Sequence, residues 1–117
     1  MNKLKVVKVD LNEITFENGV TLFSYHNSDC CESHSLTLSD LKIEDFEGLE
    51  FDLSNDGFFK RIANYGIELI PINGHSVKIA GHGYNNGYYS NKLDLIITNG
   101  KDFAKTYNIT ECQDVHG

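Results

Sequence analysis

Short apolar runs of strand length recur along the chain, and Asn-Gly or Asp-Gly pairs separate them. Lysine first alternates with apolar residues over 3–8, and later apolar runs cover 58–62, 67–72, 77–80 and 93–98. The separating pairs are Asp56-Gly57, Asn73-Gly74, Asn86-Gly87 and Asn99-Gly100. Apolar runs bounded by such pairs are typical of strands joined by tight turns. The pattern therefore predicts an antiparallel meander.

The clearest turn signal is Asn18-Gly19, which lies between the β-type runs 14–17 and 20–26. A type I′ hairpin turn needs positive φ at both central residues, and Asn-Gly meets that need. Pairing the two runs across a two-residue turn puts alternate side chains on a common face. This face is predicted to line the core, and it carries Ile14, Phe16, Phe23 and Tyr25.

One short helix is predicted near 40–48. Ser39 or Asp40 caps it, Gly48 ends it, and its apolar positions are Leu41, Ile43 and Phe46. The same apolar spacing fits a strand equally. Residues 104–108 are expected to form a last turn before a polar tail at 114–117. The predicted fold class is α+β, mostly antiparallel sheet, in a single domain over 1–117.

Negative charge is concentrated in one segment of a chain whose net charge is −7. Only Lys42 offsets the acidic residues between 40 and 56, which are Asp40, Glu44, Asp45, Glu47, Glu50, Asp52 and Asp56. Proteins that bind nucleic acid directly carry a basic stripe, so that class is excluded. The acidic segment is either a solvated face or a surface that docks on a basic partner, including one that normally holds nucleic acid.

The three cysteines do not form the framework of a secreted disulfide protein. Cys30 and Cys31 are adjacent, and Cys112 is far away in the sequence. No apolar run reaches the roughly 20 residues of a membrane span, and the N-terminus lacks the apolar stretch of a signal peptide. These observations predict a reducing, cytoplasmic location.

The candidate chemistry is concentrated in residues 26–34. Zinc takes thiolate and imidazole ligands in a tetrahedron, and the predicted ligands are His26, Cys30, Cys31 and His34. Adjacent cysteines in extended backbone point in opposite directions, so both bind one ion only where the chain turns sharply. The fourth ligand stays open among Asp29, His34, His75, His82 and Cys112. His75 and His82 follow glycines and are expected in turns.

Other interpretations of these cysteines remain open. One of the pair fits a buried structural thiol or a regulatory thiol. A catalytic Cys31 needs a base such as His26 or His82, and a catalytic zinc has Glu32 as its local base. The Tyr-rich segment 83–90 is either a hairpin turn with flanking strand tyrosines or a recognition loop.

The segment Tyr25-His26-Asn27-Ser28-Asp29-Cys30-Cys31-Glu32 resembles the His-x-x-Asp-Cys-Cys-Glu signature of a family of small phage and prophage proteins of unknown function. Asp40, the Gly-Leu-Glu-Phe segment at 48–51 and Asn-Gly-Tyr-Tyr-Ser at 86–90 fit the same pattern, and the resemblance spans about residues 13–98. His34 is not part of that signature. The chain also resembles zinc-containing anti-CRISPR inhibitors of type II-A Cas nucleases, which block the loading of target DNA.

The resemblance implies a non-enzymatic, phage-encoded inhibitor in the cytoplasm of a bacterial host. A zinc ion would attach the loop 26–34 to the sheet, which helps a small domain fold. The predicted contact surface for the Cas nuclease is Glu44, Asp45, Glu47 and Glu50. The alternatives are a phage structural or accessory protein and a small thiol- or metal-dependent hydrolase.

Overall fold

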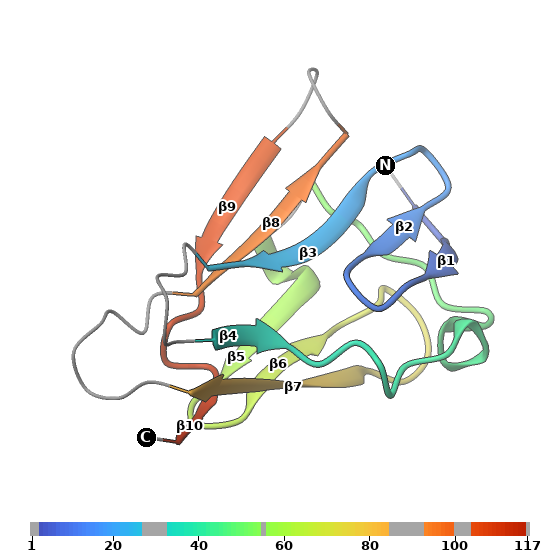
Figure 1. Ribbon diagram of the computed structural model, residues 1–117. Helices are drawn as coiled ribbons and strands as arrows, with labels where there is room; N and C mark the ends of the chain where they lie inside the picture. The colour runs from blue at the N-terminus through green and yellow to red at the C-terminus, as the bar shows by residue number, and fades with distance from the viewer. Residues whose placement is uncertain (1–2, 27–32, 55, 85–92, 100–103, 117) are drawn as a thin grey trace.

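A computed structural model describes residues 3–26, 33–54, 56–84, 93–99 and 104–116 (Figure 1). Short strands dominate these residues. In chain order the elements are β1 (Val6–Val9), β2 (Ile14–Phe16), β3 (Thr21–Tyr25), β4 (Ser33–Leu36), η1 (Ile43–Phe46), η2 (Asp56–Phe58), β5 (Phe59–Ile62), β6 (Gly66–Leu69), β7 (Val77–Tyr84), β8 (Asp94–Thr98), β9 (Ala104–Asn108) and β10 (Asp114–His116). The labels η1 and η2 denote 3₁₀ turns.

The strands form two sheets. One has the order β1-β2-β3-β8-β9, and the other is built around β7, whose first half pairs with β6. Gly81 donates to the carbonyl of Tyr65 on the β6 edge, whereas Thr37 donates to Ala80 on the opposite edge, which belongs to β4. The second half of β7 therefore lies between β4 and β10. The predicted mostly antiparallel sheet is confirmed.

One hydrophobic core holds side chains from both sheets. Leu95 and Ile97 on β8 are fully buried, and their neighbours along the strand are half-buried, as period-two alternation requires. Phe51, from the connection between η1 and η2, is also fully buried and meets the edge of the Phe16 ring at a centroid distance of 5.9 Å. The segment 46–53 therefore contributes to the core as much as a strand does.

The register of the first hairpin differs from the prediction by one residue. Ile14 pairs with Leu22, and Phe16 donates a hydrogen bond to the Val20 carbonyl, so the loop has three residues rather than two. Gly19 adopts φ = +86°, as in three-residue hairpin loops that end in a left-handed residue. A one-residue slip moves every side chain to the other face. Leu22 is therefore buried, while Tyr25 is half-exposed.

The predicted helix at 40–48 is a single 3₁₀ turn, η1. It begins after Lys42, whose amide donates to Asp45 Oδ2 at 2.9 Å, so the proposed Ser39 or Asp40 cap is wrong. Phe46 is its buried residue, and Ile43 stays 42% exposed. One buried position cannot anchor a longer amphipathic helix. Gly48, with φ = +78°, ends the segment as predicted.

The C-terminal region contains strands where the sequence predicts a turn and a tail. Residues 104–108 form β9, which pairs antiparallel with β8, and Asp114–His116 form β10, which pairs parallel with β7. His82 is likewise in a strand rather than a turn. A Cβ on the preceding Gly81 would lie 2.4 Å from the Cys112 carbonyl oxygen. The absence of a side chain at Gly81 therefore lets β7 pack closely against the backbone of the segment before β10.

Asp56 and Gly57, which were predicted to form a turn, belong to the 3₁₀ turn η2. Within the described part of the chain, no helix is long and apolar enough to span a membrane.

Candidate functional site

The ends of several strands meet at the left of Figure 1. Tyr25, the last residue of β3, pairs with Asp94 at the start of β8, and Ser33 at the start of β4 pairs with Tyr84 at the end of β7. The segments 27–32 and 85–92, which lie outside the described residues, are attached at these paired strand ends. The two motifs of the sequence are therefore anchored at the same end of the fold.

Four of the five histidines are at this end, which we call the histidine end: His26, His34, His82 and His116. Leu36 donates its amide to Ser24 Oγ at 3.1 Å, which joins β4 to β3. The two strands run in opposite directions (Figure 1), so His26, two residues after Ser24, and His34, two residues before Leu36, are displaced toward the same end. The fold thus brings together the backbone positions of two predicted ligands.

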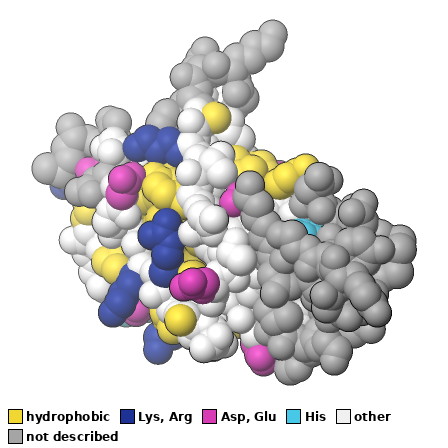
Figure 2. Space-filling view, turned by 90° about the vertical axis from the view of Figure 1, so that its left-hand side faces the viewer, with side chains coloured by type: hydrophobic (Ala, Val, Ile, Leu, Met, Phe, Trp, Pro, Cys, Tyr) yellow, Lys and Arg dark blue, Asp and Glu magenta, His cyan; other side chains and the backbone are white. Residues whose placement is uncertain are grey.

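The histidine end also contains a polar cross-strand row. His82 on β7 pairs in register with Ser35 on β4 and with Asp114 on β10, and all three residues are exposed. Directly opposed residues on neighbouring strands share a face of the sheet. Figure 2 views the molecule from this side and shows a histidine at the surface, with basic and acidic side chains interspersed elsewhere.

The predicted zinc ligands are only partly within the described structure. His26 is half-buried, and its Nε2 atom is buried. Asp29, Cys30, Cys31 and Glu32 lie outside the described residues, so neither the zinc interpretation nor the catalytic interpretation of Cys31 is tested. In the part of the chain that is described, no group of three or more His, Cys, Asp or Glu side chains could hold a metal ion.

The two remaining candidates for a fourth ligand have different surroundings. His75 is exposed in the loop between β6 and β7, beside Gly74, whose Cβ position would meet Leu49. That loop is at the right of Figure 1, away from the histidine end. Cys112 is 1% exposed, and its burial raises the pKa of the thiol. A raised pKa opposes the thiolate form that zinc binds.

The second candidate site is the acidic surface, defined as Glu44, Asp45, Glu47 and Glu50. The first three residues are exposed, and Glu50 is half-buried. Asp45 also accepts the Lys42 amide hydrogen bond that begins η1. None of the four carboxylates forms an ion pair with another described residue. Their negative charge therefore remains available to a partner.

A neighbouring loop holds the acidic surface in place. Asn73 accepts a hydrogen bond from the Glu50 amide at 2.8 Å and donates one to the Gly48 carbonyl at 3.0 Å. Ile72 donates its amide to the Glu50 carbonyl at 2.8 Å. The side chain of Ile72 remains 46% exposed beside these acids. The acidic surface thus combines negative charge with the exposed side chain of Ile72, and these hydrogen bonds hold its backbone in place.

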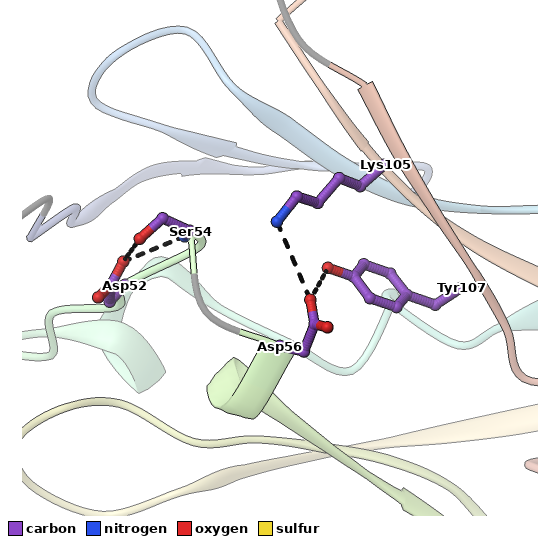
Figure 3. Close-up of polar contacts among 5 residues, drawn as sticks. All are labelled: Asp52, Ser54, Asp56, Lys105 and Tyr107. Atoms are coloured by element: carbon purple, nitrogen blue, oxygen red, sulfur yellow. Dashed lines mark hydrogen bonds and ion pairs between the residues drawn. The ribbon is translucent and has the colours of Figure 1, made fainter.

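Two other acids of the same segment have structural contacts instead (Figure 3). Asp56 accepts a hydrogen bond from the Tyr107 hydroxyl at 2.7 Å and lies 3.9 Å from Lys105 Nζ. Asp52 accepts hydrogen bonds from the hydroxyl and the amide of Ser54, and these lower its pKa. The acidic segment predicted from the sequence therefore contains two kinds of acid. Those of the acidic surface form no ion pair with described residues, whereas Asp52 and Asp56 make contacts that hold the fold together. No spacing in the sequence indicates that division.

No protein-family model, curated protein or solved structure matches this chain.

Proposed function

We propose that the protein is a non-enzymatic inhibitor that binds a basic, nucleic-acid-binding protein through its acidic surface. The observation that supports this proposal most directly is that four carboxylates are grouped around η1 and form no ion pair within the described structure. Its partner class, a type II-A Cas nuclease, comes from the sequence resemblance. In this proposal the inhibitor hinders the loading of target DNA.

The mechanism is electrostatic competition. A nuclease holds its nucleic acid in a positively charged channel, and a protein surface with clustered carboxylates is attracted to the same field. Attraction between opposite charges chiefly increases the rate of association. The hydrogen bonds of Asn73 fix the backbone beside Glu50, so little conformational entropy is lost when the surface docks. Inhibition should therefore weaken as the salt concentration rises.

Zinc has a separate, structural role in this proposal. The ligands predicted from the sequence, His26, Cys30, Cys31 and His34, belong to the segment attached at the histidine end, whereas the acidic surface is on the opposite side of Figure 1. Metal binding contributes directly to folding when a site does not exist in the unfolded chain. Changes in the acidic surface should consequently leave the metal content unaltered.

The test is a charge reversal with a matched control. The variant Glu44→Lys/Glu47→Lys changes two exposed carboxylates and spares Asp45, whose carboxylate accepts the Lys42 amide at the start of η1. The control, Glu13→Lys/Glu111→Lys, makes the same net change in charge at two acids that form no ion pair within the described residues. Binding of target DNA by a guide-loaded type II-A Cas nuclease is measured by gel shift against increasing concentrations of each protein.

We expect the wild type and the control to reduce DNA binding, and the charge-reversed variant to need at least tenfold more protein. Absence of inhibition by the wild type would reject the proposed function. Equal inhibition by the variant and the wild type would retain the inhibitor but reject the acidic surface as its contact. Thermal unfolding confirms that both variants are folded.

A further inference from the structure

An open cavity of about 480 Å³ lies beside β5, and it includes none of the four residues of the acidic surface and none of the four residues of the histidine end. One wall comes from the end of β5 and the residue after it, and the other comes from the connection between β9 and β10. The residues that define it are Arg61, Ala63, Asn108, Ile109, Thr110 and Cys112. Its volume is within the range of small-molecule sites, roughly 300–1,000 Å³.

Arg61 is the only arginine of the chain, and the structure holds its side chain in a fixed position. Its Nε donates a hydrogen bond to the Asn108 carbonyl at 2.9 Å, and its guanidinium carbon lies 5.2 Å from the centroid of the Phe59 ring. No ion pair to Arg61 occurs within the described residues. The Nε contact leaves the two Nη groups for a ligand, and such a planar pair of donors matches a carboxylate.

The opposite wall is rigid and adds one polar group. Thr110 Oγ1 accepts a hydrogen bond from the Leu93 amide at 3.2 Å, so its hydroxyl hydrogen remains for donation. Asn108 and Gln113 brace this residue, since the Thr110 amide donates to Asn108 Oδ1 and its carbonyl accepts from Gln113 Nε2. Asn64 fixes the next residue by donating to the Glu111 carbonyl at 2.8 Å. A wall ordered in advance reduces the entropic cost of binding.

We propose that this cavity binds a small organic monocarboxylic acid, with the carboxylate on Arg61 and an apolar body against the exposed Ala63. The charge balance favours a singly charged anion, because Glu111 also lines the cavity and the chain carries a net charge of −7. A doubly charged phosphate would meet stronger repulsion there. The cavity volume exceeds what a bare carboxylate fills, which leaves space for the hydrocarbon part.

The test is an NMR titration of the intact protein with sodium benzoate. Benzamide serves as the neutral analogue of the same shape, and inorganic phosphate serves as the other anion. We expect saturable shifts of the amides of Ala63 and of residues 109–112 with benzoate. Benzamide and phosphate should bind at least tenfold more weakly.

Variants distinguish a specific site from a general charge effect. Arg61→Gln removes the donors, and Lys60→Gln removes one positive charge from the adjacent exposed position on β5. Arg61→Lys keeps the charge but loses the paired donors, and it provides a second test if Arg61→Gln fails to fold. We expect both Arg61 variants to lose at least tenfold in benzoate affinity and Lys60→Gln to retain it.

Three results would overturn the proposal. The first is the absence of saturable shifts with benzoate, and the second is equal binding of benzoate and phosphate. The third is an affinity that does not change in a folded Arg61 variant, or that falls equally in Lys60→Gln. Because Arg61 belongs to neither the acidic surface nor the histidine end, none of these results bears on inhibition.

Discussion

The hydroxyl of Tyr107 on β9 donates a hydrogen bond of 2.7 Å to Asp56 in η2, although the two residues are 51 positions apart. The Tyr107 ring also meets the edges of Phe58 and Phe59 at centroid distances of 5.7 and 5.1 Å. Asp56 thus helps to join the segment before β5 to the edge strand of the other sheet. A carboxylate that looks like part of an interaction surface in the sequence is a link between the two sheets.

The hydrogen bond between Tyr107 and Asp56 should make the fold less stable at alkaline pH. Burial, and then the hydrogen bond to Asp56, raise the pKa of Tyr107 from its usual value of 10 to about 12. A raised folded-state pKa means that the stabilisation is complete below pH 10 and is lost as the pH rises from 10 through 12. Tyr107→Phe should lower the free energy of unfolding by about 1 kcal/mol at neutral pH, because it removes one hydrogen bond.

Urea unfolding at neutral pH and between pH 9 and 12 measures both effects. The variant should lose less stability than the wild type over the alkaline range. Tyr65→Phe is the control, since Tyr65 is 41% exposed and its ring is not part of the Phe58–Phe59 cluster. If Tyr107→Phe and the wild type lose the same free energy of unfolding between pH 10 and 12, ionisation of Tyr107 does not cause the alkaline loss of stability.

Close backbone packing at Gly81 predicts a second effect. A Cβ there would lie 2.4 Å from the Cys112 carbonyl oxygen and 3.2 Å from Gln113 Cα, and backbone atoms cannot move aside cheaply. Gly81→Ala should destabilise the fold by about 1–3 kcal/mol. It should also make the buried Cys112 thiol react faster with a thiol reagent, because the segment that leads to β10 must move.

Gly48→Ala separates this effect from ordinary backbone strain. Gly48 has φ = +78° and open space around its Cβ position. Its substitution should cost about 1–2 kcal/mol through conformation alone. We expect no change in the reactivity of Cys112, measured by peptide mapping of the labelled protein. Equal Cys112 labelling in the two variants would contradict the packing argument.

The first hairpin shows how far a local sequence pattern determines a fold. Its two strands and the left-handed Gly19 follow from the sequence, but the loop length decides which face is buried, and Asn18-Gly19 permits two lengths. The structure predicts that Leu22→Ala costs about 2–5 kcal/mol, because Leu22 is fully buried. Phe23→Ala should cost less, because Phe23 is only half-buried. If urea unfolding showed a larger loss of stability for Phe23→Ala than for Leu22→Ala, that result would favour the two-residue turn instead.

Long-range pairing accounts for what the sequence does not predict. β10 pairs in parallel with β7 across some thirty intervening residues, and a short polar run such as Asp114–His116 carries no local signal for that partner. The same limit applies to the candidate sites. Exposure of the acids around η1 follows from composition, but the contacts of Asp56 with Tyr107 and of Arg61 with Asn108 depend on strands brought together by the whole fold.

The histidine end gives the zinc hypothesis a direct test. Native mass spectrometry with elemental analysis should find one zinc per chain, and His26→Ala and Cys31→Ser should each lose it. His75→Ala and Cys112→Ala should keep it, because His75 is in the loop beside the acidic surface and the Cys112 thiol is buried with a raised pKa. Chelation should lower the midpoint of thermal unfolding, since a structural metal contributes to folding.

The pH dependence of zinc binding identifies the ligand chemistry. Imidazole and thiol ligands must lose their protons to bind the metal, so zinc affinity should begin to fall below about pH 8.5, where thiols become protonated, and fall more steeply below about pH 6.5, where imidazoles do as well. A competition titration with a chromophoric chelator at several pH values measures this, with Cys112→Ala as the background. Carboxylate ligands alone would keep their affinity down to about pH 5, because their pKa values are near 4. A metal-free protein whose cysteines all titrate as free thiols after unfolding would reject the zinc site and leave the acidic surface to be tested separately.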